Sequence, residues 1–91
     1  MKLIATPRFV RETKKLHAAE KAVLDAAVRS IAGNPEIGEM KKGDLAGVRV
    51  LKYRISTSQI LLAYRVAPEE DAFKLLSFGS HENFFRDLKR D

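Results

Sequence analysis

The 91-residue sequence contains no cysteine and only two histidines. Without cysteine the chain has neither disulfides nor thiolate metal sites, which is compatible with a reducing compartment. His17 and His81 are far apart in the sequence, which argues against a histidine-based metal site. No apolar run is long enough to span a membrane, and the first six residues are too short for a signal peptide. We therefore expect a soluble, cytoplasmic protein that needs no metal or cofactor and has no contact with a membrane.

Acidic residues are also scarce relative to basic ones. The chain has 12 Asp and Glu against 17 Lys and Arg, a formal net charge of +5, and its pI is about 9.7. Such a balance favours a polyanionic partner: nucleic acid, an acidic protein or an anionic membrane surface. A solvated basic surface without a partner has the same composition. Residues 1–91 suffice for a single domain with a thin core, which a covering partner would help to stabilise.

The few prolines mark the boundaries of two predicted helices. Thr6 and Pro7 indicate a helix start, because a hydroxyl suits the N-cap and the missing N–H of proline costs nothing at the first helical position. This helix should break near Leu16-His17. A second helix should cover residues 18–32 and stop at Gly33-Asn34-Pro35. The apolar stripes are Phe9, Val10, Thr13 and Leu16 on the first helix, and Val23, Leu24, Ala27, Val28 and Ile31 on the second.

Strand-like runs lie before and after these helices. The last three are joined by short turns, which favours an antiparallel meander. A charged loop at residues 36–47 precedes the meander, and residues 82–90 favour a short closing helix. We predict an α+β domain in the order β-α-α-β-β-β: a small antiparallel sheet with an N-terminal strand and a two-helix hairpin packed on one face. The predicted strands are residues 2–5, 48–55, 59–66 and 72–78.

Alternation along the strands separates an apolar face from a cationic one. Lys52, Arg54 and Arg65 fall on the face opposite the helices. Six basic residues and one acidic residue lie between Lys41 and Arg65. A cationic sheet face suits a phosphodiester backbone, although outward polar side chains are also an ordinary result of folding. The residues predicted to lie under the helices are Leu51, Tyr53, Ile55, Ile60, Leu62, Tyr64 and Val66.

A second group of reactive side chains follows the last predicted strand, at the residues just past Gly79. His81 can donate or accept a proton near neutral pH. Glu82 has three possible roles: acting as a base, orienting the imidazole, or balancing charge. Phe84 and Phe85 can stack on a base, but at least one of two adjacent aromatic residues usually packs on the core. A surface histidine without a role is the alternative for His81. His17, in the break between the helices, is interpreted as structural or incidental.

With these features the sequence resembles the RelE/ParE superfamily of bacterial type II toxins. The similarity covers nearly the whole chain, including the helix start at Pro7–Phe9, the loop ending at Leu45-Ala46-Gly47 and the basic strand at Val50–Ile55. Its most specific parts are LLAYRV at residues 61–66 and HENFFRDL at residues 81–88. The resemblance implies a metal-free endoribonuclease that cleaves mRNA on the ribosome, as many members do in the ribosomal A site. It also implies a cognate antitoxin as partner, forming a toxin–antitoxin hetero-oligomer.

The resemblance also assigns roles to individual residues. Lys52 and Arg54 match the cationic positions of the central strand, and His81 falls where ribonuclease members place a catalytic arginine or histidine. Phe84 or Phe85 lies near the position of an aromatic residue that contacts RNA, and Arg49 and Arg65 are further substrate-binding candidates. Two departures stand out. Leu61 occupies a position where arginine is common, and phenylalanine cannot transfer a proton, which puts more weight on His81 and Glu82.

The proposed chemistry needs the 2′-OH deprotonated, the phosphorane charge stabilised and the leaving 5′-oxygen protonated. Lys52 and Arg54 supply the cationic stabilisation, and His81 is the preferred general acid. The base is Glu82, or Lys52 if its cationic neighbours lower its pKa. Two other functions remain open. Some superfamily members poison DNA gyrase without cleaving RNA, and a module that binds nucleic acid or protein without toxicity has the same composition. A neighbouring reading frame for a DNA-binding antitoxin would separate a toxin from such a module.

Overall fold

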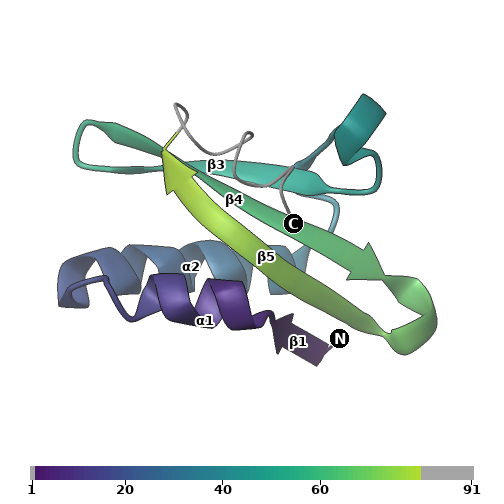
Figure 1. Ribbon diagram of the computed structural model, residues 1–91, viewed down its shortest axis with the longest axis horizontal. Coiled ribbons are helices and arrows are strands. Elements are labelled where there is room, and N and C mark those ends of the chain that lie inside the picture. Colours follow the sequence, from purple (N-terminus) through teal and green to yellow (C-terminus); the bar gives the residue numbers. More distant parts are fainter. Residues whose placement is uncertain (1, 81–91) are drawn as a thin grey trace.

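The computed structural model describes residues 2–80, and within that range five strands form one sheet with two helices against one face (Figure 1). The strand order is β1-β5-β4-β3-β2. The α+β class and the predicted order are confirmed, with one additional strand, β2. The elements are β1 (Lys2–Ala5), α1 (Pro7–Thr13), α2 (Ala18–Gly33), β2 (Glu39–Met40), β3 (Arg49–Ile55), β4 (Ser58–Ala67) and β5 (Ala72–Ser80).

Two details of the sheet differ from the sequence-based expectation. The pair β1–β5 is parallel, with Lys2 opposite Ala72, whereas the other neighbouring strands are antiparallel. A short β2 also forms inside the predicted loop and pairs with the start of β3. The β1–β5 pair joins segments from opposite ends of the chain, and β2 is only two residues long. Local sequence patterns therefore predicted neither pairing. The closing helix predicted at residues 82–90 lies outside the described residues.

The first helix begins as predicted, and its cap also ties it to the sheet. The hydroxyl of Thr6 accepts the N–H of Phe9 at 3.2 Å and lies 3.0 Å from the carbonyl of Leu75, to which it donates. Pro7 follows in the first turn. The N–H of Thr6 also donates to the carbonyl of Leu75, at 3.2 Å. Thr6, which joins β1 to α1, is therefore held against β5.

The second helix begins at the break that contains His17. Glu20 accepts the backbone N–H of His17 at 3.3 Å, and its carboxylate lies 3.1 Å from Nε2 of the His17 ring. The imidazole therefore lies at the helix start, in keeping with a structural role. At the other end the helix stops at Gly33, and Asn34 is extended at φ −152°. No left-handed glycine ends this helix, so Pro35 provides the stop signal.

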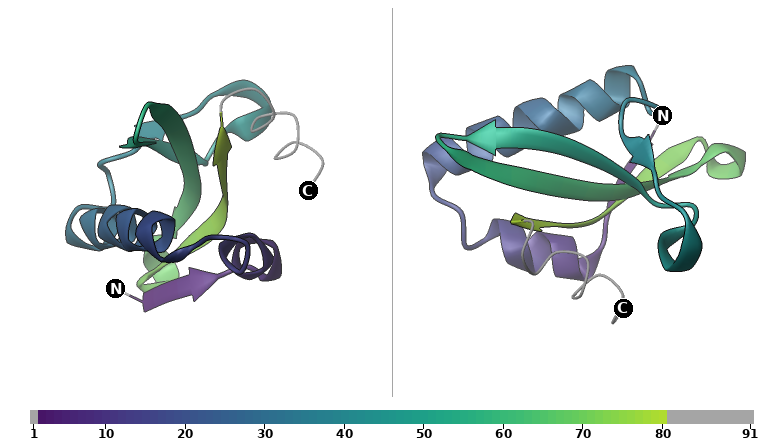
Figure 2. Two further views of the ribbon diagram at one scale, coloured as in Figure 1. Left: turned by 90° about the vertical axis from the view of Figure 1, so that its left-hand side faces the viewer. Right: turned by 90° about the horizontal axis from the view of Figure 1, so that it is seen from above.

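The main core lies between the helices and the sheet, and both helices cover the same face of the sheet (Figure 2). Leu62 and Tyr64 are fully buried there, as predicted, and Leu51, Tyr53 and Val66 pack against them. Phe9 of α1 and Leu24 and Ile31 of α2 supply the helix side. None of the helices among residues 2–80 is long and apolar enough to cross a membrane.

The opposite face of the sheet differs from the open surface that strand alternation predicted. Val48, Val50, Leu61 and Ala63 are buried there as a second cluster, with Leu45 and Leu76 packed against it. Leu76 lies on this side because it has the parity of Lys74, which is opposite Arg65; the pairing of β4 with β5 shifts just after it, so that Ser77 is opposite Ala63. The face therefore has an apolar centre, and its cations lie around that centre.

Candidate nucleic-acid interface

Lys52 and Arg54 extend from β3 on the side away from the helices, and both are exposed. Their partners across the ladder are Leu61 and Gln59 on β4. Two residues along a strand span about 7 Å, so the two cations form a close pair on one face. The sequence-based prediction of a cationic pair on this face is confirmed. Two positive groups at this spacing beside an apolar surface suit contact with a phosphate-bearing chain.

The sheet register connects this pair to the end of β5. Lys52 is opposite Leu61, and Leu61 is opposite Gly79. Neighbouring strands are about 4.8 Å apart, so Lys52 and Gly79 are separated by about 10 Å across the sheet. Gly79 carries no side chain, and Leu61 between them is fully buried. One row across three strands thus runs from the cationic pair to the residue just before the end of β5.

Four predicted site residues follow β5 directly in the sequence. The strand ends at Ser80, which is opposite Ile60 on β4. His81, Glu82, Phe84 and Phe85 lie outside the described residues 2–80, so their placement stays a prediction.

Arg65 lies on the same face as Lys52 but away from it. It is exposed on β4 and four residues beyond Leu61, which is about 13 Å along the strand. Its guanidinium lies beside Gly47, a glycine with φ +91°. The structure therefore does not bring Arg65 into the Lys52–Arg54 pair. It can reach only a more distant phosphate of a bound chain.

Arg49 points to the other face of β3 and is not brought together with Lys52 and Arg54. Its guanidinium donates to the carbonyl of Gly38 at 2.8 Å and of Glu36 at 3.3 Å. Its ladder partner is Tyr64, on the helix side. These contacts assign Arg49 to holding the loop before β2. Strand alternation contains this signal, because Arg49 has the parity of Leu51 and Tyr53.

Neither tyrosine of the chain lies with the cationic pair. Burial raises the pKa of Tyr53 to about 12, and the nearby carboxylate of Glu20 acts in the same direction. Burial also raises the pKa of Tyr64, against opposing effects from the N–H of Gly38 and from Arg49. Both hydroxyls keep their protons at neutral pH and face the helix side of the sheet. Among residues 2–80 no group of three or more His, Asp or Glu side chains is placed to hold a metal ion.

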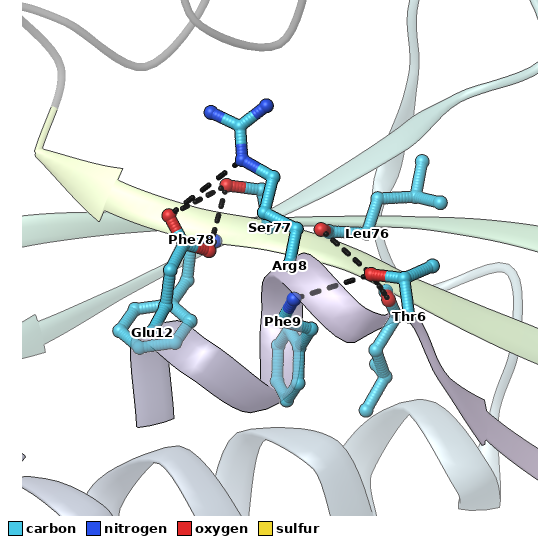
Figure 3. A network of polar contacts seen from close by, with 8 residues as sticks. Thr6, Arg8, Phe9, Glu12, Leu76, Ser77 and Phe78 are labelled. Carbon is cyan, nitrogen blue, oxygen red and sulfur yellow. Dashed lines mark hydrogen bonds and ion pairs between the residues drawn. The ribbon is translucent and has the colours of Figure 1, made fainter. Parts of the chain in front are cut away.

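Glu12, for which no role was predicted from the sequence, lies beside the end of β5 (Figure 3). Its carboxylate accepts the hydroxyl of Ser77 at 3.0 Å and the N–H of Phe78 at 3.4 Å. Arg8, one turn earlier on α1, has its Nε 3.9 Å from the same carboxylate. Since 65 residues separate Glu12 from Ser77, no local pattern could reveal this contact.

Comparisons with known proteins identify the class to which this fold and basic face belong. The family model for the ParE-like toxin of type II bacterial toxin–antitoxin systems matches residues 3–89. The chain therefore belongs to that family, and it is a type II toxin of the RelE/ParE type. The resemblance seen in the sequence is confirmed. A comparison with curated proteins finds no match.

Solved structures show the same fold. The chain is similar to a chain of the intact E. coli RelBE toxin–antitoxin complex, with a TM-score of 0.74 and 23% identity over 89% of this chain and 96% of that one. An E. coli RelE double mutant in the free state gives a TM-score of 0.75 and 23% identity over 98% and 95%. A conserved hypothetical protein from Helicobacter pylori gives 0.61 and 18% over 93% and 99%. At these identities the similarity is one of fold.

Proposed function

We propose that this toxin is a metal-free endoribonuclease that cleaves mRNA on the ribosome and that a cognate antitoxin neutralises it. The observation that supports this most directly is the row from Lys52 through Leu61 to Gly79. It sets the exposed cations about 10 Å across the sheet from the strand end that precedes His81. A phosphate bound at Lys52 and Arg54 would then lie on the sheet face that leads toward the proton-transfer residues.

The proposed roles follow from what RNA cleavage requires. Lys52 and Arg54 stabilise the charge that develops on the phosphorane. His81 protonates the departing 5′-oxygen, and the proton of the 2′-OH goes to Glu82 or to a neutral Lys52; in the second case Arg54 alone supplies the positive charge. Phe84 or Phe85 stacks on a base of the substrate. Arg65 contacts a phosphate farther along the chain. Arg49 is left out of this assignment, because its guanidinium is used by the carbonyls of Gly38 and Glu36.

An antitoxin partner is supported by two observations. The chain carries a net charge of +5, which favours an acidic partner. In addition, a solved structure of the same fold is part of a toxin–antitoxin complex. We therefore include a toxin–antitoxin hetero-oligomer in the proposal.

The test compares Lys52→Ala and His81→Ala with the unmodified toxin. Growth arrest is followed after induction, and cleavage of mRNA is mapped on isolated ribosomes. Each substitution should abolish or strongly reduce cleavage and relieve the arrest. Lys21→Ala is the matched control, since Lys21 is an exposed cation on α2, on the helix side of the molecule. Full toxicity and cleavage in both the Lys52 and the His81 variants would rule out the proposed site.

A second function is favoured by the description of the matching family model, which is ParE-like. Members of the superfamily that poison DNA gyrase need no proton-transfer histidine. The buried Leu61, where an arginine is common among the ribonucleases, agrees with this alternative. It predicts DNA breaks and an SOS response without mRNA cleavage, and a toxicity that does not change in His81→Ala. The same set of variants therefore separates the two functions.

A further inference from the structure

One edge of β5 changes its partner halfway along the strand. The first four residues, Ala72 to Leu75, pair with β1. At Thr6 the chain leaves the sheet to begin α1, so β1 does not continue beside Ser77 and Phe78. Backbone groups on an uncovered strand edge need another partner. Helix α1 lies along this part of the edge (Figure 3).

Glu12 supplies that partner from the second turn of α1. Its Oε1 lies 3.0 Å from Oγ of Ser77 and 3.4 Å from the backbone N of Phe78. Its Oε2 lies 3.3 Å from the same hydroxyl. Ser77 is only 3% exposed. The carboxylate thus takes the place of a neighbouring strand's carbonyl for Phe78, and it also accepts the hydroxyl of a buried serine.

Helix α1 holds the same part of β5 through a second contact. The rings of Phe9 and Phe78 meet edge to face, with centroids 5.4 Å apart and planes at 70°. Phe9 is buried in the main core. The strand end is therefore fixed by an apolar contact beneath it and by a carboxylate at its edge. Of the two, only the carboxylate acts on the backbone itself.

We propose that Glu12 is a positioning residue for the ribonuclease reaction, and this inference rests on the proposed function. By holding Ser77 and Phe78 it sets the position and direction of the strand end from which the chain continues to His81. The row that links Gly79 to Lys52 keeps its spacing only while this strand end keeps its register. Glu12 does not touch the substrate in this proposal. It acts through β5.

The expected effect is on turnover and not on binding. A displacement of about 1 Å at a reacting group can cost about 100-fold in rate. Glu12→Ala should lower kcat for cleavage of ribosome-bound mRNA by about 10-fold or more. KM should stay within about two-fold of the wild-type value, because Lys52 and Arg54 keep their places on β3. Substrate binding is then retained while the chemical step becomes slower. Ser77→Ala removes one of the two groups that Glu12 holds and should show a smaller loss in kcat.

The experiment uses the full chain with one conservative variant and a matched control. Glu12→Gln keeps an oxygen that accepts from Ser77 and Phe78, so it should retain most of the wild-type kcat. The control is Glu20→Ala: Glu20 likewise binds a backbone N–H, at His17, and its side chain is 30% exposed against 28% for Glu12. That variant should leave kcat unchanged. Hydrogen exchange at the Phe78 amide should accelerate in Glu12→Ala and not in Glu20→Ala.

Three results would overturn the inference while leaving the proposed function in place. These are a wild-type kcat in Glu12→Ala, an equal loss in Glu12→Gln and Glu12→Ala, and an equal loss in Glu20→Ala. The last would mean that general destabilisation explains the effect. A wild-type toxin that cleaves no ribosome-bound mRNA would instead overturn the proposed function, and the positioning role with it.

Discussion

The hydroxyl of Tyr64 accepts the backbone N–H of Gly38 at 2.8 Å, and the ring of Tyr64 lies against the same glycine. A Cβ on residue 38 would stand 2.8 Å from that ring. The hydroxyl also donates to the carbonyl of Pro35 at 2.7 Å. One fully buried side chain on the central strand therefore holds the loop between α2 and β2. Arg49 binds the carbonyl of Gly38 and completes the attachment.

Tyr64→Phe should lower the free energy of unfolding by about 1–3 kcal/mol, because the Gly38 N–H and the Pro35 carbonyl lose their partner. Urea denaturation measures the change. Tyr53→Phe is the control, since the hydroxyl of Tyr53 makes no hydrogen bond to another residue in the part of the chain that the structure describes. That variant should stay within about 0.5 kcal/mol of wild type. Equal effects in both variants would show that the loop attachment contributes nothing.

Alkaline titration should detect the raised pKa of both tyrosines. Burial raises the pKa of Tyr53 from 10.0 to about 12 and that of Tyr64 above 10.0, so the folded state holds these protons more tightly than the unfolded chain. The stability that this difference contributes is present below pH 10 and is lost as the pH rises toward 12. Tyrosinate absorbance should therefore stay low at pH 10 in the native protein and reach half its maximum there in denaturant. Native titration at pH 10 would contradict the burial of both hydroxyls.

Gly47→Ala should destabilise the protein more than Gly43→Ala. Both glycines have positive φ, +91° and +67°, so alanine costs backbone strain at each, about 1 kcal/mol. Only at Gly47 would the new Cβ also meet a side chain, the guanidinium of Arg65, whereas the space around Gly43 is open. Thermal unfolding measures both variants. Adding Arg65→Ala to Gly47→Ala should reduce the difference in stability between the Gly47 and Gly43 variants. An unchanged difference would mean that backbone strain alone explains the cost at Gly47.

A salt titration should separate the cations of β3 into two groups. Lys52→Ala and Arg54→Ala should each weaken binding to single-stranded RNA and reduce the slope of log affinity against log salt by about 0.7. Arg49→Ala should leave that slope unchanged, because its guanidinium faces the carbonyls of Gly38 and Glu36. It should instead lower stability by about 1.5–3 kcal/mol. A reduced slope in the Arg49 variant would show that Arg49 contacts the RNA.

Local patterns in the sequence were enough to predict the helices, the main strands and the two faces of the meander. Thr6-Pro7 marks the start of α1, Pro35 marks the stop of α2, and alternation along β3 assigns Lys52 and Arg54 to one side. These features could be predicted because capping, helix breaking and side-chain direction depend on residues only a few positions apart. The same alternation, applied to Arg49, already separates it from the cationic pair.

Only the tertiary structure decided which segments meet. The parallel pairing of β1 with β5, the buried cluster around Leu61 and the carboxylate of Glu12 beside Ser77 each join residues from different strands or from opposite ends of the chain. Such contacts depend on the closure of the whole sheet, so no short stretch of the sequence specifies which residues become partners. The sequence by itself therefore determined a basic α+β chain with cations on one strand face. The fold decided how those cations are spaced from the end of β5 and which residue holds that end.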